Sequence, residues 1–263
     1  MDGGLAAGLD DARREYSGRD VIAFVGQAGS GRTVVAALLR HTLATYWDPK
    51  FTGVHGSVIR GRRALDSAML GMRNGMYPDE TLRDGRPEIR IRLRNLRRDP
   101  GDWEIAIDGA RGEGAVGLLS AGGPPGRVLE AGMGHLLLAT KYVLVVDCTG
   151  RGTWDGDGPM AAAAVEGLAR MRDIMPDGDG TGPEVAVLFT KADALPEMRH
   201  VPAGDLLESY GRLRDSLRAN GARYVARRSH ISHEEGAAGR IRDPFEYSDA
   251  EYTALISWMI GDG

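Results

Sequence analysis

The sequence predicts an α/β protein in which helices cover both faces of a mainly parallel sheet of about six strands, with one antiparallel edge strand. Short apolar runs typical of buried strands, such as Val21–Val25, Tyr142–Val146 and Val185–Thr190, alternate with stretches of helical spacing. The chain has 263 residues, 42% of them hydrophobic, which suits one large domain of this class.

Composition excludes several other classes of protein. The net charge of −4 argues against a globally basic nucleic-acid binder, and the single cysteine excludes a disulfide framework within the chain. The N-terminus lacks the pattern of a secretory signal, and the longest apolar stretch, His135–Cys148, is interrupted by Lys141 and is too short to span a bilayer. We therefore expect a cytoplasmic protein that binds no nucleic acid, and its richness in glycine and arginine is typical of high-GC bacterial genomes.

The first part of the chain predicts a strand, a glycine-rich turn and a helix. Residues 1–19 are polar and are predicted as a tail, which leaves residues 20–263 as one domain. After the strand Val21–Val25, a helix is predicted from Thr33 to about Tyr46, and a second at about Arg62–Met72.

The middle of the chain predicts a hairpin. In the segment EIRIRLR, apolar residues alternate with arginines, which predicts a half-buried strand with its arginines on the solvent face. Trp103–Ile107 is predicted to pair with it antiparallel. The remaining elements are predicted at about Val128–Thr140 (helix), Tyr142–Val146 (strand), Met160–Ile174 (helix), Val185–Thr190 (strand), Asp205–Ala219 (helix), Tyr224–Ser232 (short segment) and Asp249–Ile260 (helix).

The glycine-rich turn carries the main chemical motif. Its residues are Gly26, Gln27, Ala28, Gly29, Ser30, Gly31, Arg32 and Thr33, which fit G-x-x-x-x-G-K-[ST] at every fixed position but one. Glycines let backbone N–H groups turn toward phosphate oxygens, and the following helix directs its positive dipole end at the same anion. The Thr33 hydroxyl is placed to bind Mg²⁺. A glycine turn without a ligand is the plainer alternative.

Arg32 stands where the motif has lysine. Arginine keeps the positive charge, but its guanidinium is planar and forked rather than a point charge. Binding of phosphate is therefore expected, whereas the usual lysine bridge between the β- and γ-phosphates does not follow.

A second motif follows the strand VAVLF. Thr190, Lys191, Ala192 and Asp193 match [NT]-K-x-D. The Asp193 carboxylate can accept hydrogen bonds from guanine N1–H and the 2-amino group, which adenine lacks, and the Lys191 stem can lie over the base. An ordinary charged loop is the alternative.

Candidate residues for Mg²⁺ and the γ-phosphate lie between these motifs. Asp108 closes the strand WEIAI, where a carboxylate can hold Mg²⁺. Glu113 follows in a loop one residue longer than D-x-x-G and is a candidate for orienting water, with a plain loop carboxylate equally open. Thr81, with Thr52 as the alternative, is the candidate threonine for Mg²⁺ and the γ-phosphate; a turn residue is equally open.

Two further residues complete the set. Ser232, with Ser229 as the alternative, is the candidate serine of the last loop near the base; an ordinary polar loop is equally open. Cys148, at a strand end, is expected to be a buried small residue rather than a nucleophile.

Taken in this order, the motifs resemble those of Ras-like GTPases of the translation-factor-related P-loop class, over about residues 20–260. The segment with Y-P-x-x-T and D-x-x-x-G-E is similar to bacterial double-GTPase-like domains of conflict or signalling systems. The resemblance implies a three-layer P-loop NTPase fold with the strand of the 90s at one sheet edge. It also implies GTP or GDP and Mg²⁺ as ligands, and switch loops that contact a protein effector.

Three functional hypotheses follow. The first is a guanine-nucleotide switch with slow or partner-dependent hydrolysis, because Arg32 and the longer loop after Asp108 both affect the γ-phosphate side. The second is a pseudo-GTPase scaffold that lacks turnover because of Arg32. The third is an ATP-dependent P-loop protein, which requires Thr190–Asp193 to be a chance match. Whether the chain is an enzyme is left open.

Overall fold

The computed structural model describes the chain in segments that include the whole central sheet. The described residues are 3–16, 19–27, 29–45, 53–76, 89–95, 102–107, 119, 125–130, 133–149, 159–174, 181–229, 231–233, 241–247 and 249–261.

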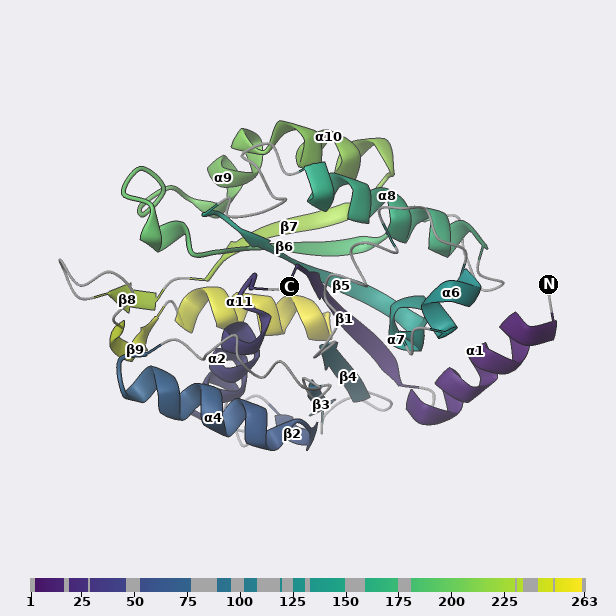
Figure 1. The fold of residues 1–263 in the computed structure, drawn as a ribbon, viewed down its shortest axis with the longest axis horizontal. Helices are drawn as coiled ribbons and strands as arrows, with labels where there is room; N and C mark the ends of the chain where they lie inside the picture. Colours follow the sequence, from purple (N-terminus) through teal and green to yellow (C-terminus); the bar gives the residue numbers. More distant parts are fainter. Residues whose placement is uncertain are drawn as a thin grey trace.

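The strands form one large sheet and one small hairpin (Figure 1). The large sheet has seven strands in the order β2-β3-β4-β1-β5-β6-β7. Their bounds are β1 Asp20–Gly26, β2 Val54–Arg60, β3 Ile89–Asn95, β4 Asp102–Ile107, β5 Ala139–Asp147, β6 Glu184–Thr190 and β7 Arg223–Arg228. Strands β4, β1, β5, β6 and β7 run parallel, whereas β3 is antiparallel to β4, and β2 to β3. Strands β8 (Ile231–His233) and β9 (Ile241–Tyr247) pair separately.

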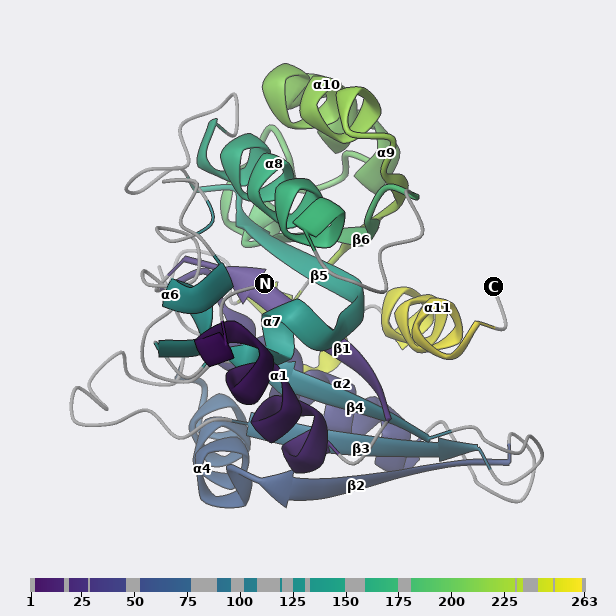
Figure 2. The same ribbon diagram turned by 90° about the vertical axis from the view of Figure 1, so that its right-hand side faces the viewer.

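Helices cover both faces of the large sheet. The helices are α1 Gly3–Tyr16, α2 Arg32–Thr45, α4 Arg62–Arg73, α6 Pro125–Glu130, α7 Gly134–Leu138, α8 Pro159–Ile174, α9 Ala203–Ser209, α10 Gly211–Ala219 and α11 Asp249–Ile260, with a 3₁₀ turn at Ala192–Ala194. One apolar core lies under α2, α4 and α11, and the other under α1 and α6–α10. Figure 2 shows α11 and α7 on opposite sides of β1 and β5. This confirms the predicted three-layer α/β fold, with a mainly parallel sheet between two layers of helices. No described helix has both the length and the apolar character needed to cross a bilayer.

Strand β2 is the largest difference from the sequence prediction. It pairs with β3 and becomes the sheet edge, so the strand of the 90s stands one place further in. Val54 alone among its residues is fully buried, and the others are half-buried or exposed. Its sequence VHGSVIR therefore lacks the regular apolar alternation by which a strand is detected.

Two predicted helices are divided in the structure. The one expected at Val128–Thr140 is two short helices, α6 and α7, followed directly by β5. The one expected at Asp205–Ala219 is interrupted at Tyr210, whose backbone leaves helical geometry while its ring packs in the core. The predicted antiparallel pairing of the strands of the 90s and 100s is confirmed.

Helix α1 lies within the segment that we had set apart as a polar tail. Its residues Leu9 and Tyr16 are buried in the core beside α7. The boundary at residue 19 between tail and domain stays a prediction.

Helix α1 also changes the environment of strand β3. We expected its arginines on the solvent face, and for Arg90 this was wrong: its side chain is buried because α1 covers it. Its guanidinium forms an ion pair with Glu104 of β4, hydrogen-bonds Glu15 at 2.8 Å and lies 4.2 Å from the centre of the Tyr16 ring. The fully buried Glu104 carboxylate also accepts a hydrogen bond from Arg19 at 3.1 Å.

We expect Glu104→Gln to lower the free energy of unfolding by about 3 kcal/mol, because it removes the buried carboxylate that pairs with Arg90 and Arg19 and leaves Arg90 only the exposed Glu15. Urea denaturation would measure this. Asp102→Asn is the control: its ion pair with the exposed Arg94 should contribute less than about 1 kcal/mol. An equal loss of unfolding free energy in the two variants would contradict the larger contribution that we assign to the buried Glu104 carboxylate.

Candidate functional site

Several predicted site residues gather at one edge of the parallel sheet. In register, Gly26 of β1 lies opposite Val145 of β5, and Asp147 of β5 lies opposite Thr190 of β6. Because these strands run parallel, their carboxyl ends and the loops that follow meet at the same edge. The glycine-rich turn and the T-K-x-D motif are therefore neighbours in space.

Two glycines of the glycine-rich turn have left-handed backbone conformations. Gly29 and Gly31 adopt φ values of 77° and 89°, a region that other residues rarely adopt. The Ser30 N–H donates to the Gln27 carbonyl at 3.2 Å, and the Val35 N–H donates to Gly31 at 2.9 Å. Helix α2 begins at Arg32, directly after the turn, so the positive end of its dipole lies beside the turn.

Close packing fixes Gly26 at the base of the turn. A Cβ atom at this position would lie 2.8 Å from Ser30 Oγ and 2.9 Å from the Val145 carbonyl oxygen. Ser30 Oγ is buried and has no hydrogen-bond partner among the described residues. A buried hydroxyl without a partner is costly, and an anion held in the turn is one group that could accept its proton. The turn thus fits a phosphate group.

Arg32 and Thr33 open helix α2. Arg32 is only 6% exposed, which is rare for an arginine. Thr33 follows in the first helical turn and is half-buried. The two residues therefore stand beside the glycine turn, as the motif predicts.

A hydrogen bond joins the two motifs. Thr190 Oγ1 donates to the Ser30 carbonyl oxygen at 2.7 Å and lies 3.2 Å from the Val146 carbonyl oxygen. Thr190 is itself buried, and its carbonyl accepts the Cys148 N–H at 2.9 Å. One threonine hydroxyl therefore connects the glycine turn with the ends of β5 and β6.

Lys191 is held in an unusual backbone conformation. Its φ is 58°, and no other non-glycine residue in the described ranges has a positive φ. Its ammonium group lies 2.6 Å from Asp147 Oδ2, while Asp147 Oδ1 accepts the N–H and the hydroxyl of Thr149 at 2.9 and 2.7 Å. Asp147 therefore fixes the direction of the Lys191 side chain.

Asp147 is the site residue that sequence reasoning missed. It directly follows the predicted strand Tyr142–Val146, and we assigned it no role. A carboxylate at the carboxyl end of the strand between the two motif strands was the available signal, because such strand ends face the ligand crevice in open α/β sheets.

Asp193 lies in the 3₁₀ turn Ala192–Ala194 and is buried. The Arg199 guanidinium donates to its backbone carbonyl at 3.2 Å. The turn thereby holds the T-K-x-D aspartate near the same sheet edge as the glycine turn.

The two candidate serines of the last loop differ in their surroundings. Ser229 directly follows β7 and is buried; its N–H donates to the Phe189 carbonyl at 2.7 Å, and its hydroxyl pairs with that of Tyr252 at 2.8 Å. Both groups are thus already paired within the fold. Ser232 lies further along, in β8, where it is opposite Asp243.

Five candidate residues lie outside the described residues: Ala28, Thr52, Thr81, Asp108 and Glu113. Of the residues predicted to hold Mg²⁺, Thr33 alone falls within the described part of the chain. In that part there is no group of three or more His, Cys, Asp or Glu side chains arranged to hold a metal ion.

No protein-family model matches the chain, and no curated protein matches it. Among solved structures, the GTP-bound GTPase-like domain of Ski7 from S. cerevisiae is 12% identical, with a TM-score of 0.44, over 92% of this chain and 50% of that one. The GDP-bound RocCORdC structure of Roco2 from Methanosarcina barkeri is 13% identical, with a TM-score of 0.34, over 92% and 49%. The SRb-GTP/SRX complex from Chaetomium thermophilum is 11% identical, with a TM-score of 0.38, over 84% and 94%.

This chain therefore spans about half the length of the Ski7 and Roco2 chains. At these identities and TM-scores, the matches do not show which family the chain belongs to.

Cys148 follows β5 beside the site, and its thiol is buried. Burial raises the pKa of this thiol to about 12, with the nearby Asp147 and Asp193 carboxylates adding to the effect. At neutral pH the thiol is therefore protonated and unreactive, in line with its predicted role as a small buried residue.

We expect iodoacetamide to alkylate Cys148 roughly a hundredfold more slowly in the folded protein than in urea, because both access and thiolate are suppressed. Mass spectrometry over time would measure the rate. The urea-unfolded chain at the same pH is the control. Similar rates in the two states would contradict the buried, high-pKa thiol.

Proposed function

We propose that the chain is a guanine-nucleotide-binding switch protein with slow or partner-dependent GTP hydrolysis. The hydrogen bond between Thr190 and the Ser30 carbonyl carries this proposal. It brings a phosphate-type turn and a guanine-type motif, which are 160 residues apart in sequence, to one sheet edge. A glycine turn alone fits any nucleotide, whereas the two motifs together fit a guanine nucleotide.

On the phosphate side, the backbone N–H groups of the glycine turn and the N-terminus of α2 would bind the phosphate oxygens. Arg32 would neutralise part of their charge. Thr33 would be the first Mg²⁺ ligand, with Thr81 and Asp108 expected to complete the set. Bound Mg²⁺ would neutralise charge that develops on the β- and γ-phosphates during hydrolysis.

On the base side, the Asp193 carboxylate would accept hydrogen bonds from guanine N1–H and the 2-amino group. Asp147 would hold Lys191 so that its aliphatic stem covers the base. Ser232 is the proposed serine near the base, since the N–H and hydroxyl of Ser229 are already paired within the fold.

Hydrolysis is proposed to be slow for two reasons. First, Arg32 replaces the lysine that usually bridges the β- and γ-phosphates. Second, Glu113, the candidate for orienting water, follows Asp108 in a lengthened loop, and no arginine finger is recognised in the sequence to assist it. A protein effector at the switch loops could supply what is missing. A cytoplasmic bacterial protein similar to the double-GTPase-like domains would fit this role.

Displacement of a fluorescent GDP analogue tests the proposal directly. We expect GTP and GDP to compete with the analogue and ATP not to compete, with tighter binding in the presence of Mg²⁺. Equal competition by ATP would favour the ATP-dependent alternative. Failure to bind the analogue at all would favour a scaffold without nucleotide.

Asp193→Asn should abolish the preference for GTP over ATP, because an amide can no longer accept from both guanine donors. The ratio of the two competition constants measures this. Asp173→Asn, at an exposed aspartate near the end of α8, is the matched control and should leave the ratio unchanged. An unchanged ratio in Asp193→Asn would remove the guanine assignment.

Arg32→Lys distinguishes a slow GTPase from a pseudo-GTPase. If Arg32 alone suppresses turnover, lysine should raise single-turnover GTP hydrolysis by about tenfold or more. Phosphate release from bound GTP is the measurement, with Arg40→Lys on the same helix as the control. Unaltered hydrolysis with intact GTP binding would show that Arg32 is not what limits turnover, and would contradict a scaffold that lacks turnover because of Arg32.

A further inference from the structure

The loop that carries most of the T-K-x-D motif continues from β6 to helix α9 and comprises residues 191–202, here called the β6–α9 loop. Backbone hydrogen bonds of 3.0–3.2 Å, each from an N–H to the carbonyl three residues earlier, form successive turns within it. These bonds are local, so they shape the loop without fixing its position relative to the sheet. Contacts with other elements must therefore hold Asp193 in place.

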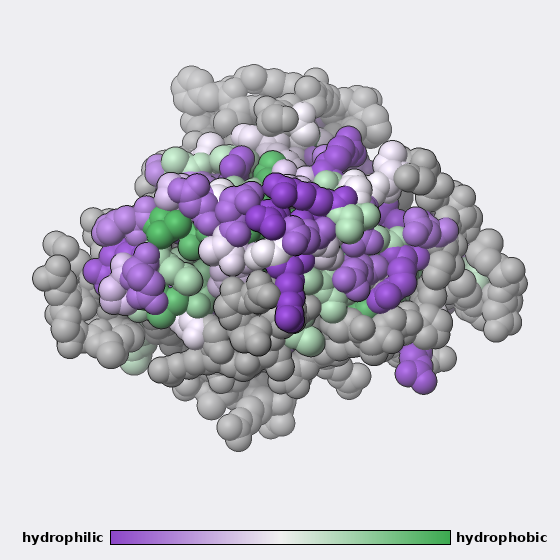
Figure 3. Space-filling model, turned by 90° about the horizontal axis from the view of Figure 1, so that it is seen from above, coloured by the Kyte–Doolittle hydropathy of each residue, from purple (hydrophilic) through white to green (hydrophobic). Residues whose placement is uncertain are grey.

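The inner side of the β6–α9 loop is apolar. Leu195, Met198 and Val201 pack against the core that lies under α1 and α6–α10. Hydrophilic side chains cover most of the coloured surface over the neighbouring helices α8, α9 and α10, with small separated apolar areas (Figure 3). Apolar packing holds the loop against the core, but it is non-directional and does not set the orientation of single peptides. Polar contacts are needed for that.

Arg228 supplies such contacts from the neighbouring strand. It is the last residue of β7 and lies opposite Phe189, the residue that precedes the motif. Its Nη1 atom donates to the carbonyl oxygens of Arg199 at 2.8 Å and Val201 at 3.0 Å. This nitrogen carries two hydrogens, so it can make both bonds at once. The far end of the β6–α9 loop is thereby tied to the strand beside β6.

Arg199 continues the connection back to the motif. While its backbone carbonyl is held by Arg228, its own Nε donates to the Asp193 carbonyl at 3.2 Å. Two arginines in series thus connect β7 with the peptide of Asp193. Which side-chain rotamers a residue can adopt depends on its backbone angles. Fixing this peptide therefore limits the directions in which the Asp193 carboxylate can point.

The guanidinium of Arg228 also lies close to the acidic residues of the candidate site. Burial, and to a lesser extent the Asp147 and Asp193 carboxylates, raise the pKa of the Cys148 thiol to about 12, whereas the charge of Arg228 opposes this rise. All three charged groups therefore lie near the same thiol, at the carboxyl ends of the parallel strands.

We propose that Arg199 and Arg228 are positioning residues that hold the Asp193 carboxylate in the orientation needed to recognise the 2-amino group of guanine. This inference rests on the proposed function, in which Asp193 accepts hydrogen bonds from the base. The two arginines act through the peptide of Asp193 and not by contact with the nucleotide. Their loss should therefore reduce discrimination between bases more than it reduces the binding of the phosphates, which the glycine turn provides.

Isothermal titration calorimetry with GDP and with inosine diphosphate (IDP) tests this inference, because inosine differs from guanosine only in lacking the 2-amino group. A site built to hydrogen-bond an amino group discriminates against an analogue without it. We expect the wild type to bind GDP about tenfold or more tightly than IDP. Arg199→Met and Arg228→Met keep an aliphatic stem and remove the donors. Each should lower the GDP:IDP affinity ratio by about threefold or more, with a smaller change in the affinity for IDP.

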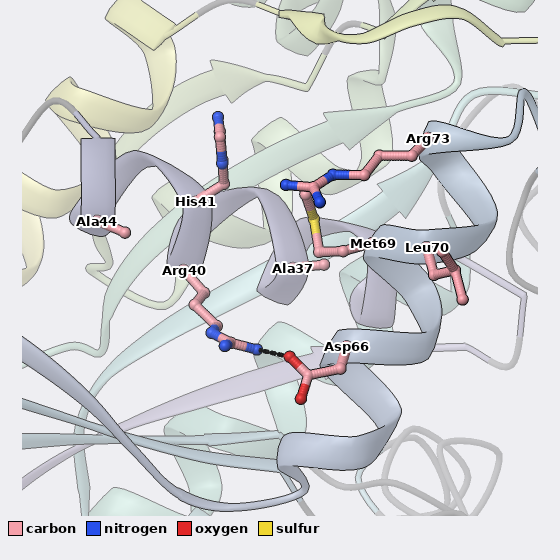
Figure 4. Close-up of a pocket in the computed structure, with 8 residues that line it drawn as sticks. All are labelled: Ala37, Arg40, His41, Ala44, Asp66, Met69, Leu70 and Arg73. Atoms are coloured by element: carbon pink, nitrogen blue, oxygen red, sulfur yellow. Dashed lines mark hydrogen bonds and ion pairs between the residues drawn. The ribbon is translucent and has the colours of Figure 1, made fainter.

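Two other arginines provide matched controls. Arg223 lies on the same strand as Arg228, and its guanidinium is 3.8 Å from Glu184. Arg40 of α2, on the other face of the sheet, is bound to Asp66 of α4 at 2.5 Å (Figure 4). Arg223→Met and Arg40→Met each remove one cation without changing the β6–α9 loop, so both should keep the GDP:IDP ratio of the wild type.

Asp193→Ala connects the effect with the carboxylate. Its GDP:IDP ratio should be close to one, and adding Arg228→Met should not lower it further, because Arg228 acts through Asp193. The inference is overturned if both arginine variants keep the wild-type ratio, if they lose affinity for GDP and IDP equally, or if Arg223→Met lowers the ratio as much. A ratio near one in the wild type, or an unchanged ratio in Asp193→Ala, would overturn the guanine assignment itself together with this inference, so the two failures are distinguishable.

Discussion

The candidate site depends on the hydroxyl of Thr190. The strands β1, β5 and β6 bring their ends together, but parallel pairing alone does not set the orientation of the loops that follow. The bond from Thr190 Oγ1 to the Ser30 carbonyl fixes one peptide of the glycine turn relative to the end of β6. A buried carbonyl without this donor would cost about 1–3 kcal/mol, so the two loops hold one another in place. A serine could keep the bond, whereas valine, of similar shape, could not.

The Asp147–Lys191 ion pair also holds a loop of the site in place, but it does so for a residue in a strained backbone conformation. Holding a non-glycine residue at positive φ costs roughly 1 kcal/mol or more. The neighbouring strand offsets this cost: Asp147 is oriented by two hydrogen bonds from Thr149 and presents its second oxygen to the lysine. Strain that is retained by specific partners is characteristic of functional loops, and here it falls on a residue of the T-K-x-D motif.

Sequence patterns predicted those parts of the fold whose signal is local. Apolar runs and glycine spacing predicted the central strands and the turn before α2, because burial on both faces requires continuous apolar residues. Strand β2 escaped detection since it lies half-exposed at an edge. The burial of Arg90 could not be predicted from the alternation in β3, because it depends on α1, which is distant in sequence. Asp147 was overlooked because its role arises only when β5 is placed between the two motif strands. The sequence predicted the order of the glycine turn and the T-K-x-D motif along the chain, whereas the contact between them is seen only in the folded structure.

Helix α2 connects the glycine turn with the apolar core on one face of the sheet. It begins at Arg32, directly after the turn, and Leu38, Leu39 and Leu43 are buried in the core that it shares with α4 and α11. A helix of 14 residues is about 20 Å long, so core packing holds this helix over much of its length. The position of the glycine turn therefore depends on the packing of this core as well as on the hydrogen bond from Thr190.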